Sequence, residues 1–280
     1  FIANPGYLFG RNLHANASWG VTGFRVGKVV AVKANVGDAA PAMLAAMLIF
    51  LLAFVIILLT KIPEPHIETA EQRAAAKANK DKYSPLSFRH FVLGAIAIFF
   101  YLVIEVGIPS MANLYMTEVN GPGYVGGAVA GTVVAAYWFS MMIGRLVGGA
   151  IGSKVSSRAM ITGCSVVAIA LVLAAMFAPV QMVTVFGKSF PLSMCFVVLC
   201  GLCTSVMWGG IFNMAAEGLG KYVPMGSGIF VAIVFGGVLI PVQGMLADKI
   251  GILNSYWMTI ALLAYVLFYA LVGSKLGQKK

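Results

Sequence analysis

Long apolar runs, separated by short polar or glycine- and proline-rich joints, make up most of the chain. Each run reaches or approaches the roughly 20 residues that an α-helix needs to cross the hydrocarbon core of a bilayer. Helix-breaking residues mark the joints, as in the turn Gly121-Pro122-Gly123. The pattern predicts an all-α membrane protein with seven transmembrane helices, placed at Ala42–Leu59, Phe91–Met116, Gly126–Ala150, Met160–Ala178, Pro191–Ala216, Gly226–Leu246 and Tyr256–Val272.

Composition supports lipid as the solvent of this chain. Hydrophobic residues make up 60% of the 280 positions and charged residues only 10%, and the mean hydropathy is +0.93. A soluble domain carries about 25% charged residues, so a soluble fold of this composition would lack the charges that solvate its surface. The formal net charge of +10 sits in the joints and forms no basic face. We therefore expect no nucleic-acid partner.

Basic residues are distributed unevenly between alternate joints, and in membrane proteins they concentrate in cytoplasmic loops. One set of joints holds only Lys188 and Lys249. The opposite set holds Lys61, Arg73, Lys77, Lys80, Lys82, Arg89, Lys154, Arg158, Lys221, Lys275, Lys279 and Lys280. This asymmetry predicts that residues 61–90 and the C-terminus are cytoplasmic.

The predicted spans also divide the chain into parts. The chain begins at Phe1, without Met or a signal-peptide pattern, so we expect either that its N-terminus has been removed or that it is a piece of a longer gene product. Val21–Val36 loosely alternates and could form a short hairpin, with a disordered or damaged segment as the equal alternative. Glu64–Lys82 favours a surface helix. The expected parts are an external or irregular segment (1–41), one helix (42–60), a cytoplasmic loop (61–90), a six-helix bundle (91–275) and a cytoplasmic tail (276–280).

Glu105 is the acidic residue that lies farthest from the ends of the predicted spans. Inserting an ionised carboxylate at mid-bilayer costs about 2.5 kcal/mol or more, so we expect it to face a polar cavity or a partner. Tyr101 lies one turn earlier on the same face, and Gly107 and Pro109 follow. Pro109 removes a backbone donor and frees a carbonyl near Glu105, which predicts a bent helix and a substrate site. A carboxylate satisfied by another helix is the structural alternative.

Other polar and aromatic residues within the spans are further candidates for the same site. The amides of Asn113, Asn213 and Gln243 offer both donors and acceptors, which suits sugar hydroxyls, although amide bonds between helices are the plain alternative. Trp138 and Trp208 could stack on a pyranose ring or serve as interfacial residues.

Arg145 lies near the cytoplasmic end of its span, in a stretch from Gly144 to Gly152 with glycine at every fourth position. This spacing lets helices approach closely. Arg145 is a candidate gating residue or a snorkelling cation. Glu217, at the end of another span, could pair with Arg145 or with Lys221.

The remaining motifs point to transport and away from soluble enzymes. Glycines and Pro241 make the sixth run breakable, as alternating access requires. No phosphate loop, metal cluster or Ser/His/Asp set is present, and all three histidines fall outside the predicted spans, so we expect neither an enzyme nor a cofactor. The cysteines read as small packing residues: Cys164, Cys195, Cys200 and Cys203.

The chain resembles the fucose/proton symporter family of the major facilitator superfamily. The residues that carry the resemblance are Tyr101-Leu-Val-Ile-Glu105-Val-Gly107-Ile, Tyr137-Trp138 leading into Gly144-Arg145, Gly218-Leu-Gly220-Lys221, and Gly236-Gly237 through Pro241 to Gly244-x-x-Ala247-Asp248. The resemblance covers about residues 42–275 and implies helices six to twelve of a twelve-helix transporter, whose N-terminal half is the missing partner.

The resemblance also implies a function. Members carry fucose, glucose, galactose or related sugars with protons into bacteria, across the inner membrane. It puts Glu105 in helix seven, facing the central cavity, and Asn213 and Gln243 on helices ten and eleven. The proton-coupling carboxylates are implied mainly in the N-terminal half. Two departures stand out: Gly152-Ser153 precedes Lys154 where an acidic residue is usual, and residues 1–41 do not resemble helix five.

The sequence leaves other functions to compare with sugar transport. A transporter of another solute, such as a drug or organic anion, shares most of these features, but no basic residue lies at mid-span. A seven-helix photoreceptor would need a Lys in the last span for a retinal Schiff base, and a receptor of that topology an Asn-Pro motif near the end of that span; the last span has neither. A fragment that is inactive without its N-terminal half is a third possibility.

Overall fold

The computed structural model describes residues 21–25, 28–32, 40–60, 84–119 and 121–275. Its helices are α2 (Ala40–Leu59), α4 (Arg89–Thr117), α5 (Gly127–Ile151), α6 (Ser157–Phe177), α7 (Leu192–Thr204), α8 (Met207–Ala216), α9 (Val223–Ala232), α10 (Ile240–Ile250) and α11 (Tyr256–Phe268). Shorter helical turns are η2 (Pro85–Ser87), η3 (Gly220–Tyr222), η4 (Ile233–Leu239) and η5 (Tyr269–Gly273). The strands are β1 (Val21–Arg25), β2 (Lys28–Val32), β3 (Met182–Val185) and β4 (Lys188–Pro191).

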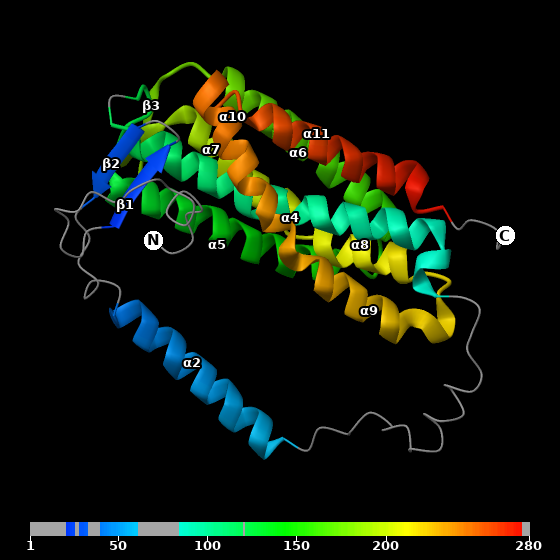
Figure 1. The fold of residues 1–280 in the computed structure, drawn as a ribbon. Coiled ribbons are helices and arrows are strands. Elements are labelled where there is room, and N and C mark those ends of the chain that lie inside the picture. The colour runs from blue at the N-terminus through cyan, green and yellow to red at the C-terminus, as the bar shows by residue number, and fades with distance from the viewer. Residues whose placement is uncertain (1–20, 26–27, 33–39, 61–83, 120, 276–280) are drawn as a thin grey trace. The chain divides into compact units, whose positions relative to one another are not determined.

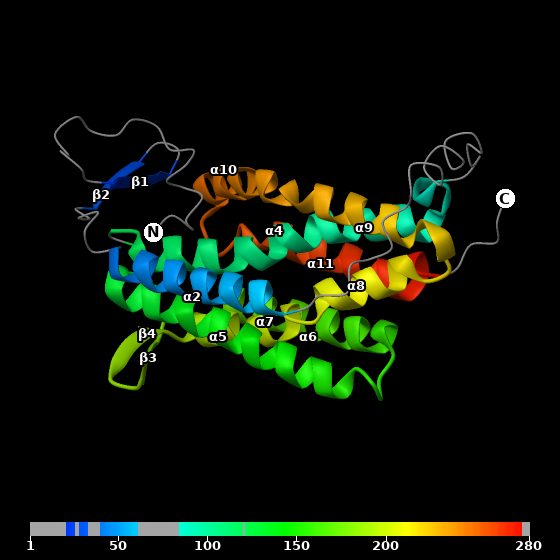
Figure 2. The same ribbon diagram turned by 90° about the horizontal axis from the view of Figure 1, so that it is seen from below.

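Helices α4 to α11 form one unit, in which α4 is the central element. It packs against α5, α8, η4 and α11, while α7 packs between α5 and α6 (Figures 1 and 2). The face-to-face contacts are apolar: Phe91, Ile98, Ile104 and Ile108 of α4 are fully buried. Because large side chains are buried along the whole of α4, a polar group on this helix is costly to bury unless it has a hydrogen-bonding or charged partner.

The predicted membrane helices are confirmed. In the described residues, six helical stretches are long and apolar enough to cross a bilayer: Arg89–Thr117, Gly127–Ile151, Ser157–Phe177, Leu192–Ala216, Gly220–Ile250 and Tyr256–Gly273. Helix α2, with 20 residues and no acidic residue in its first turn, is the seventh apolar helix, and it belongs to a separate unit. Strands β1 and β2 pair, as the alternation of Val21–Val36 allowed. The surface helix expected over Glu64–Lys82 lies outside the described residues.

Two of the apolar stretches are interrupted. Between α7 and α8 the Ser205 hydroxyl donates to the Leu202 carbonyl at 2.6 Å, taking the acceptor that an unbroken helix would offer to the Val206 N–H. Such competition by Ser side chains bends helices. Between α9 and α10 the chain tightens into the 3₁₀ turns of η4, within the glycine-rich run predicted to break. Pro109, for which a bent helix is predicted, lies inside a continuous α4 and does not divide it. Its effect is the loss of one backbone hydrogen-bond donor.

The glycine spacing on α5 lets it approach the end of α7 and the joint between α7 and α8 closely. A Cβ on Gly144 would lie 2.7 Å from the Leu202 carbonyl oxygen, and one on Gly148 would collide with the Val206 side chain. Only glycine fits at such a distance between helices. The α5 backbone is therefore seated against the α7–α8 interruption, as the small-residue spacing predicted.

Candidate functional site

A cavity of about 690 Å³ opens along α4, α5, α6 and α8. The volume falls within the range of small-molecule sites. Polar side chains and glycines make up most of its lining: Tyr101, Glu105, Arg145, Gly148, Gly149, Gly152, Ser157, Met160, Ser205, Val206, Trp208, Gly209, Gly210 and Asn213. The cavity thus extends from mid-α4 along the half of each helix that the loop charges predict to be cytoplasmic.

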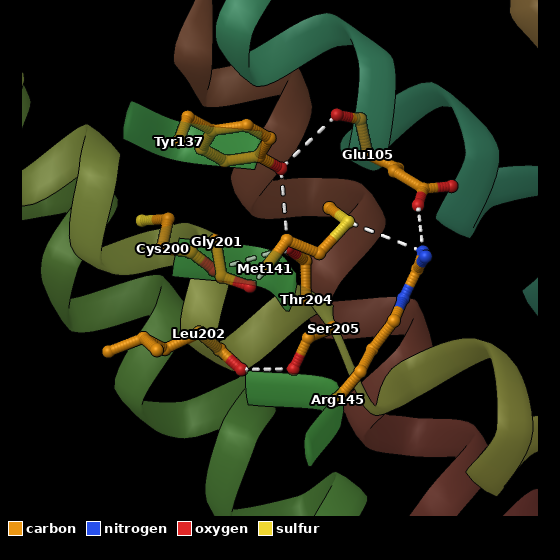
Figure 3. A network of polar contacts seen from close by, with 9 residues as sticks. All are labelled: Glu105, Tyr137, Met141, Arg145, Cys200, Gly201, Leu202, Thr204 and Ser205. Atoms are coloured by element: carbon orange, nitrogen blue, oxygen red, sulfur yellow. Dashed lines mark hydrogen bonds and ion pairs between the residues drawn. The ribbon is translucent and has the colours of Figure 1, made fainter. Parts of the chain in front are cut away.

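Glu105 and Arg145 form an ion pair at the edge of this cavity. Arg145 Nη2 donates to Glu105 Oε1 at 3.0 Å, and it also lies 3.3 Å from the Met141 sulfur (Figure 3). The Glu105 side chain is 13% exposed and the Arg145 side chain 58% exposed. The pair is neutral overall, and the arginine keeps open donors on its cavity side. Arg145 therefore extends its charge to mid-α4, and its partner is Glu105, not the proposed Glu217.

The carbonyl that Pro109 leaves free finds a side-chain partner. In an α-helix the carbonyl of residue 105 would accept from the N–H of residue 109, which proline lacks. The Tyr137 hydroxyl of α5 donates to the Glu105 carbonyl oxygen instead, at 3.1 Å, and it also lies 3.2 Å from the Thr204 hydroxyl. Figure 3 shows Tyr137 and Arg145 approaching Glu105 from the same helix. Both the side chain and the main chain of Glu105 are thus held by α5.

An aromatic and an amide group complete the cavity wall. Tyr101 is fully buried, and it lies in the cavity wall beside Glu105. Its ring lies 6.2 Å from that of Trp208, at a tilted angle. Asn213, one and a half turns beyond Trp208, is exposed. The site offers a phenol, an indole face, a carboxylate, a guanidinium and an amide.

Several predicted site residues lie elsewhere. Gln243 is buried between α10, α11 and α4: its amide nitrogen donates to the Thr259 hydroxyl at 3.1 Å, and a Cβ on Gly107 would meet its oxygen at 2.8 Å. Asn113 is half-buried toward the opposite end of α4. Trp138 is 39% exposed and packs edge-on against Tyr137, with ring centroids 5.4 Å apart. None of these three lines the cavity.

Glu217 and His90 meet at the end of the bundle that the loop charges predict to be cytoplasmic. Glu217 caps the C-terminus of α8, exposed and outside the cavity lining. Its backbone carbonyl lies 2.8 Å from His90 Nε2. His90 is the second residue of α4 and is buried, so the expectation that all histidines lie outside the spans is wrong for this residue. The reason is local: η2 ends at Ser87, and the helix begins two residues earlier than hydropathy alone indicates.

Sequence reasoning missed the glycine-lined floor of the cavity and the role of Tyr137. Gly209 and Gly210 follow Trp208 directly in the sequence and line the cavity with it. Two glycines beside a tryptophan could have indicated an aromatic face with open space next to it. Tyr137 appeared only as part of a family motif. Ser157 and Met160 carry no signal, because they enter the lining through the packing of α6 on α8. The described part of the chain contains no group of three or more His, Cys, Asp or Glu that could hold a metal ion.

Comparison with known proteins identifies the fold that this site belongs to. The family model described as Major Facilitator Superfamily matches residues 20–240. The chain belongs to the Major Facilitator Superfamily. Among relatives of this superfamily member, a glucose/galactose transporter of Brucella abortus is 33% identical over 88% of this chain and 57% of its own length. A putative glucose/galactose transporter of Helicobacter pylori is 29% identical over 82% of this chain and 53% of its own length.

A further relative and a solved structure also match the chain. The L-fucose-proton symporter of Escherichia coli is 25% identical over 79% of this chain and 48% of its own length. A crystal structure of the superfamily transporter FucP, in the outward conformation, matches with a TM-score of 0.61 at 22% identity, over 82% of this chain and 53% of that one. The resemblance seen in the sequence is confirmed. The chain spans about half the length of these relatives.

Proposed function

We propose that this chain is the C-terminal half of a sugar transporter of the major facilitator superfamily, which carries a glucose-, galactose- or fucose-type sugar together with a proton. The observation that carries the proposal is the cavity formed by Tyr101, Glu105, Arg145, Trp208 and Asn213 at membrane depth. The names of its relatives, glucose/galactose transporters and an L-fucose-proton symporter, point to the same substrate class.

The chemistry of the cavity suits an uncharged polyhydroxylated solute. The Glu105–Arg145 pair cancels its own charge while leaving hydrogen-bonding positions open on both partners. The indole of Trp208 presents an apolar face of the kind on which a pyranose ring stacks, and the Asn213 amide adds both a donor and an acceptor. In this assignment Tyr101, Glu105, Trp208 and Asn213 contact sugar, and Arg145 holds Glu105 and gates the cavity.

The partner and the setting follow from the same proposal. The chain would assemble with an N-terminal half that supplies the opposite wall of the cavity and the main proton-coupling carboxylates. Transport would proceed by alternating exposure of the cavity to the two sides, without enzymatic chemistry. The protein would be a multi-pass component of a bacterial inner membrane, with 61–90 and the C-terminus in the cytoplasm. The roles of Asn113, Trp138, Gln243 and Glu217 would then be in packing between helices and at their ends.

An organic anion is the second candidate substrate, because Arg145 is 58% exposed at the cavity. A carboxylate ligand would have to compete with Glu105 for the guanidinium, whereas a sugar would add hydrogen bonds to an intact pair. This difference favours the sugar.

Ligand-dependent thermal stabilisation separates these candidates. A solute that binds only the folded state raises the melting temperature, by an amount that grows with its concentration over its dissociation constant. The purified transporter containing this chain should be stabilised by one or more of fucose, glucose and galactose, and not by a matched panel of organic anions. Stabilisation by anions alone, or by none of the sugars at saturating concentration, would contradict the proposal.

A further inference from the structure

Tyr137 connects α4 and α7 next to the cavity, without lining the cavity itself. Its hydroxyl donates to the Glu105 carbonyl on α4 and lies 3.2 Å from the Thr204 hydroxyl at the end of α7. Either hydroxyl can donate in the contact between Tyr137 and Thr204, because the Thr204 hydroxyl also donates to the Cys200 carbonyl at 3.2 Å. The Tyr137 phenol therefore connects two groups (Figure 3). One is the Glu105 carbonyl of α4, which Pro109 leaves without a backbone donor, and the other is the hydroxyl of Thr204, the last residue of α7.

The position of Tyr137 is fixed by close contact between the backbones of α5 and α7. A Cβ on Gly201 would lie 2.6 Å from the Tyr137 carbonyl oxygen. The Ser140 hydroxyl lies 2.8 Å from that carbonyl and 2.7 Å from the Val198 carbonyl. The Tyr137 ring itself is only 1% exposed. With its backbone seated on α7 and its ring enclosed, Tyr137 cannot release α4 without a rearrangement of this contact.

Both ends of the Tyr137 bridge lead directly into the cavity. Glu105 lines one wall, and Ser205 and Trp208, which follow Thr204, line another. Tyr137 does not line the cavity. We infer that Tyr137 is a positioning residue for the solute site: it sets the separation between Glu105 and the Trp208 wall by holding the Glu105 carbonyl and Thr204 together. The inference rests on the proposed function for the identity of the solute.

Tyr137→Phe tests this inference, with Tyr256→Phe as the matched control. Tyr256 is equally buried, and its hydroxyl donates to another α4 carbonyl, that of Ile108, at 2.8 Å. Ile108 does not line the cavity, whereas Glu105 does. Both variants lose a buried hydrogen bond to α4 and should lose comparable stability. In the transporter containing this chain, Tyr137→Phe should raise the half-saturating sugar concentration about tenfold, and Tyr256→Phe by no more than about twofold. Equal values for the two variants would overturn the inference.

Pro109→Ala in the Tyr137→Phe background separates positioning from simple stability. Alanine supplies the missing backbone N–H, so the Glu105 carbonyl regains a donor and the melting temperature should recover. The link to Thr204 stays absent, so the half-saturating concentration should remain raised. Recovery of sugar affinity together with stability would show a merely structural role and overturn the inference.

A readout without sugar keeps this test apart from that of the proposed function. In a protein whose only tryptophan is Trp208, with the others replaced by Phe, quenching of its fluorescence by acrylamide reports access to the cavity wall. Tyr137→Phe should change this quenching and Tyr256→Phe should not. Failure of the parent protein to bind sugar would refute the proposed function, whereas unchanged quenching in Tyr137→Phe would refute the positioning role.

Discussion

The carboxylate of Glu105 and the guanidinium of Arg145 form an ion pair at 3.0 Å across the contact between α4 and α5. The pair resolves the difficulty of a carboxylate at membrane depth, because each charge lowers the cost of burying the other. It is asymmetric: Glu105 is largely enclosed, whereas Arg145 faces the cavity. The same helix that supplies Arg145 also supplies Tyr137, so α5 fixes both the side chain and the carbonyl of Glu105.

Replacement of Glu105 should damage transport more than folding. Glu105→Gln keeps the shape but removes the charge, so Arg145 is left without its counter-ion at the site. We expect sugar uptake to fall at least about tenfold, equivalent to roughly 1.4 kcal/mol, with normal amounts of protein in the membrane. Glu118→Gln, at the far end of the same helix and outside the cavity lining, is the control. Undiminished uptake in Glu105→Gln would remove Glu105 from the site.

Stability should reveal the pairing itself through a double-mutant cycle. Arg145→Gln leaves the enclosed Glu105 without a partner and should lower the melting temperature more than Glu105→Gln does, because Arg145 can turn to solvent. The double variant leaves no unpaired charge and should be more stable than the sum of the single losses predicts. Strictly additive losses would show that the two side chains do not interact in the membrane protein.

Trp208 should contribute to sugar affinity through its ring. Trp208→Ala removes the stacking face and should raise the half-saturating sugar concentration by about tenfold, whereas Trp208→Phe should retain part of the affinity. Trp257→Phe, at an exposed position at the start of α11, serves as the control and should leave affinity unchanged. An equal effect of Trp208→Ala and Trp257→Phe would argue against stacking.

Close packing of α5 on the α7–α8 interruption should make Gly144 intolerant of a methyl group. Gly144→Ala places a Cβ against the Leu202 carbonyl and should cost roughly 1–3 kcal/mol of stability. Gly131→Ala is on the same helix with open space around the added carbon, so it should be neutral or slightly stabilising. The melting temperatures of Gly144→Ala and Gly131→Ala, measured in the same detergent, test this prediction. Equal values would refute the close approach of α5 to the Leu202 carbonyl.

Most of the helices could be predicted because the bilayer imposes a one-dimensional rule. A chain crossing lipid must satisfy its backbone internally and present apolar side chains, so hydropathy along the sequence marks the spans directly. Phe91–Met116 and Gly126–Ala150 thus fall within two residues of α4 and α5. The carbonyl freed by Pro109 was also foreseeable, because proline removes a donor in any helix.

The composition of the site was harder to predict, because it depends on which face of each helix meets which neighbour. Asn213 and Gln243 are both intramembrane amides, yet one lines the cavity and the other is buried against α11. The interruption after Thr204 arises from one hydroxyl competing with the backbone, a signal shared by many serines that sit in regular helices. Tyr137 and Arg145 contact Glu105 because α5 packs against both α4 and α7, which the sequence of α5 alone does not specify.

Sugar uptake driven by an imposed pH gradient tests the central claim most directly. The transporter containing this chain, with its N-terminal half, is reconstituted into liposomes loaded at neutral pH and diluted into acidic buffer with labelled glucose, galactose or fucose. The account predicts accumulation of at least one sugar above its external concentration, abolished by a protonophore and strongly reduced in Glu105→Gln. Sugar that only equilibrates, with or without the gradient, would contradict proton coupling, and no uptake of any of the three sugars would contradict the proposed function.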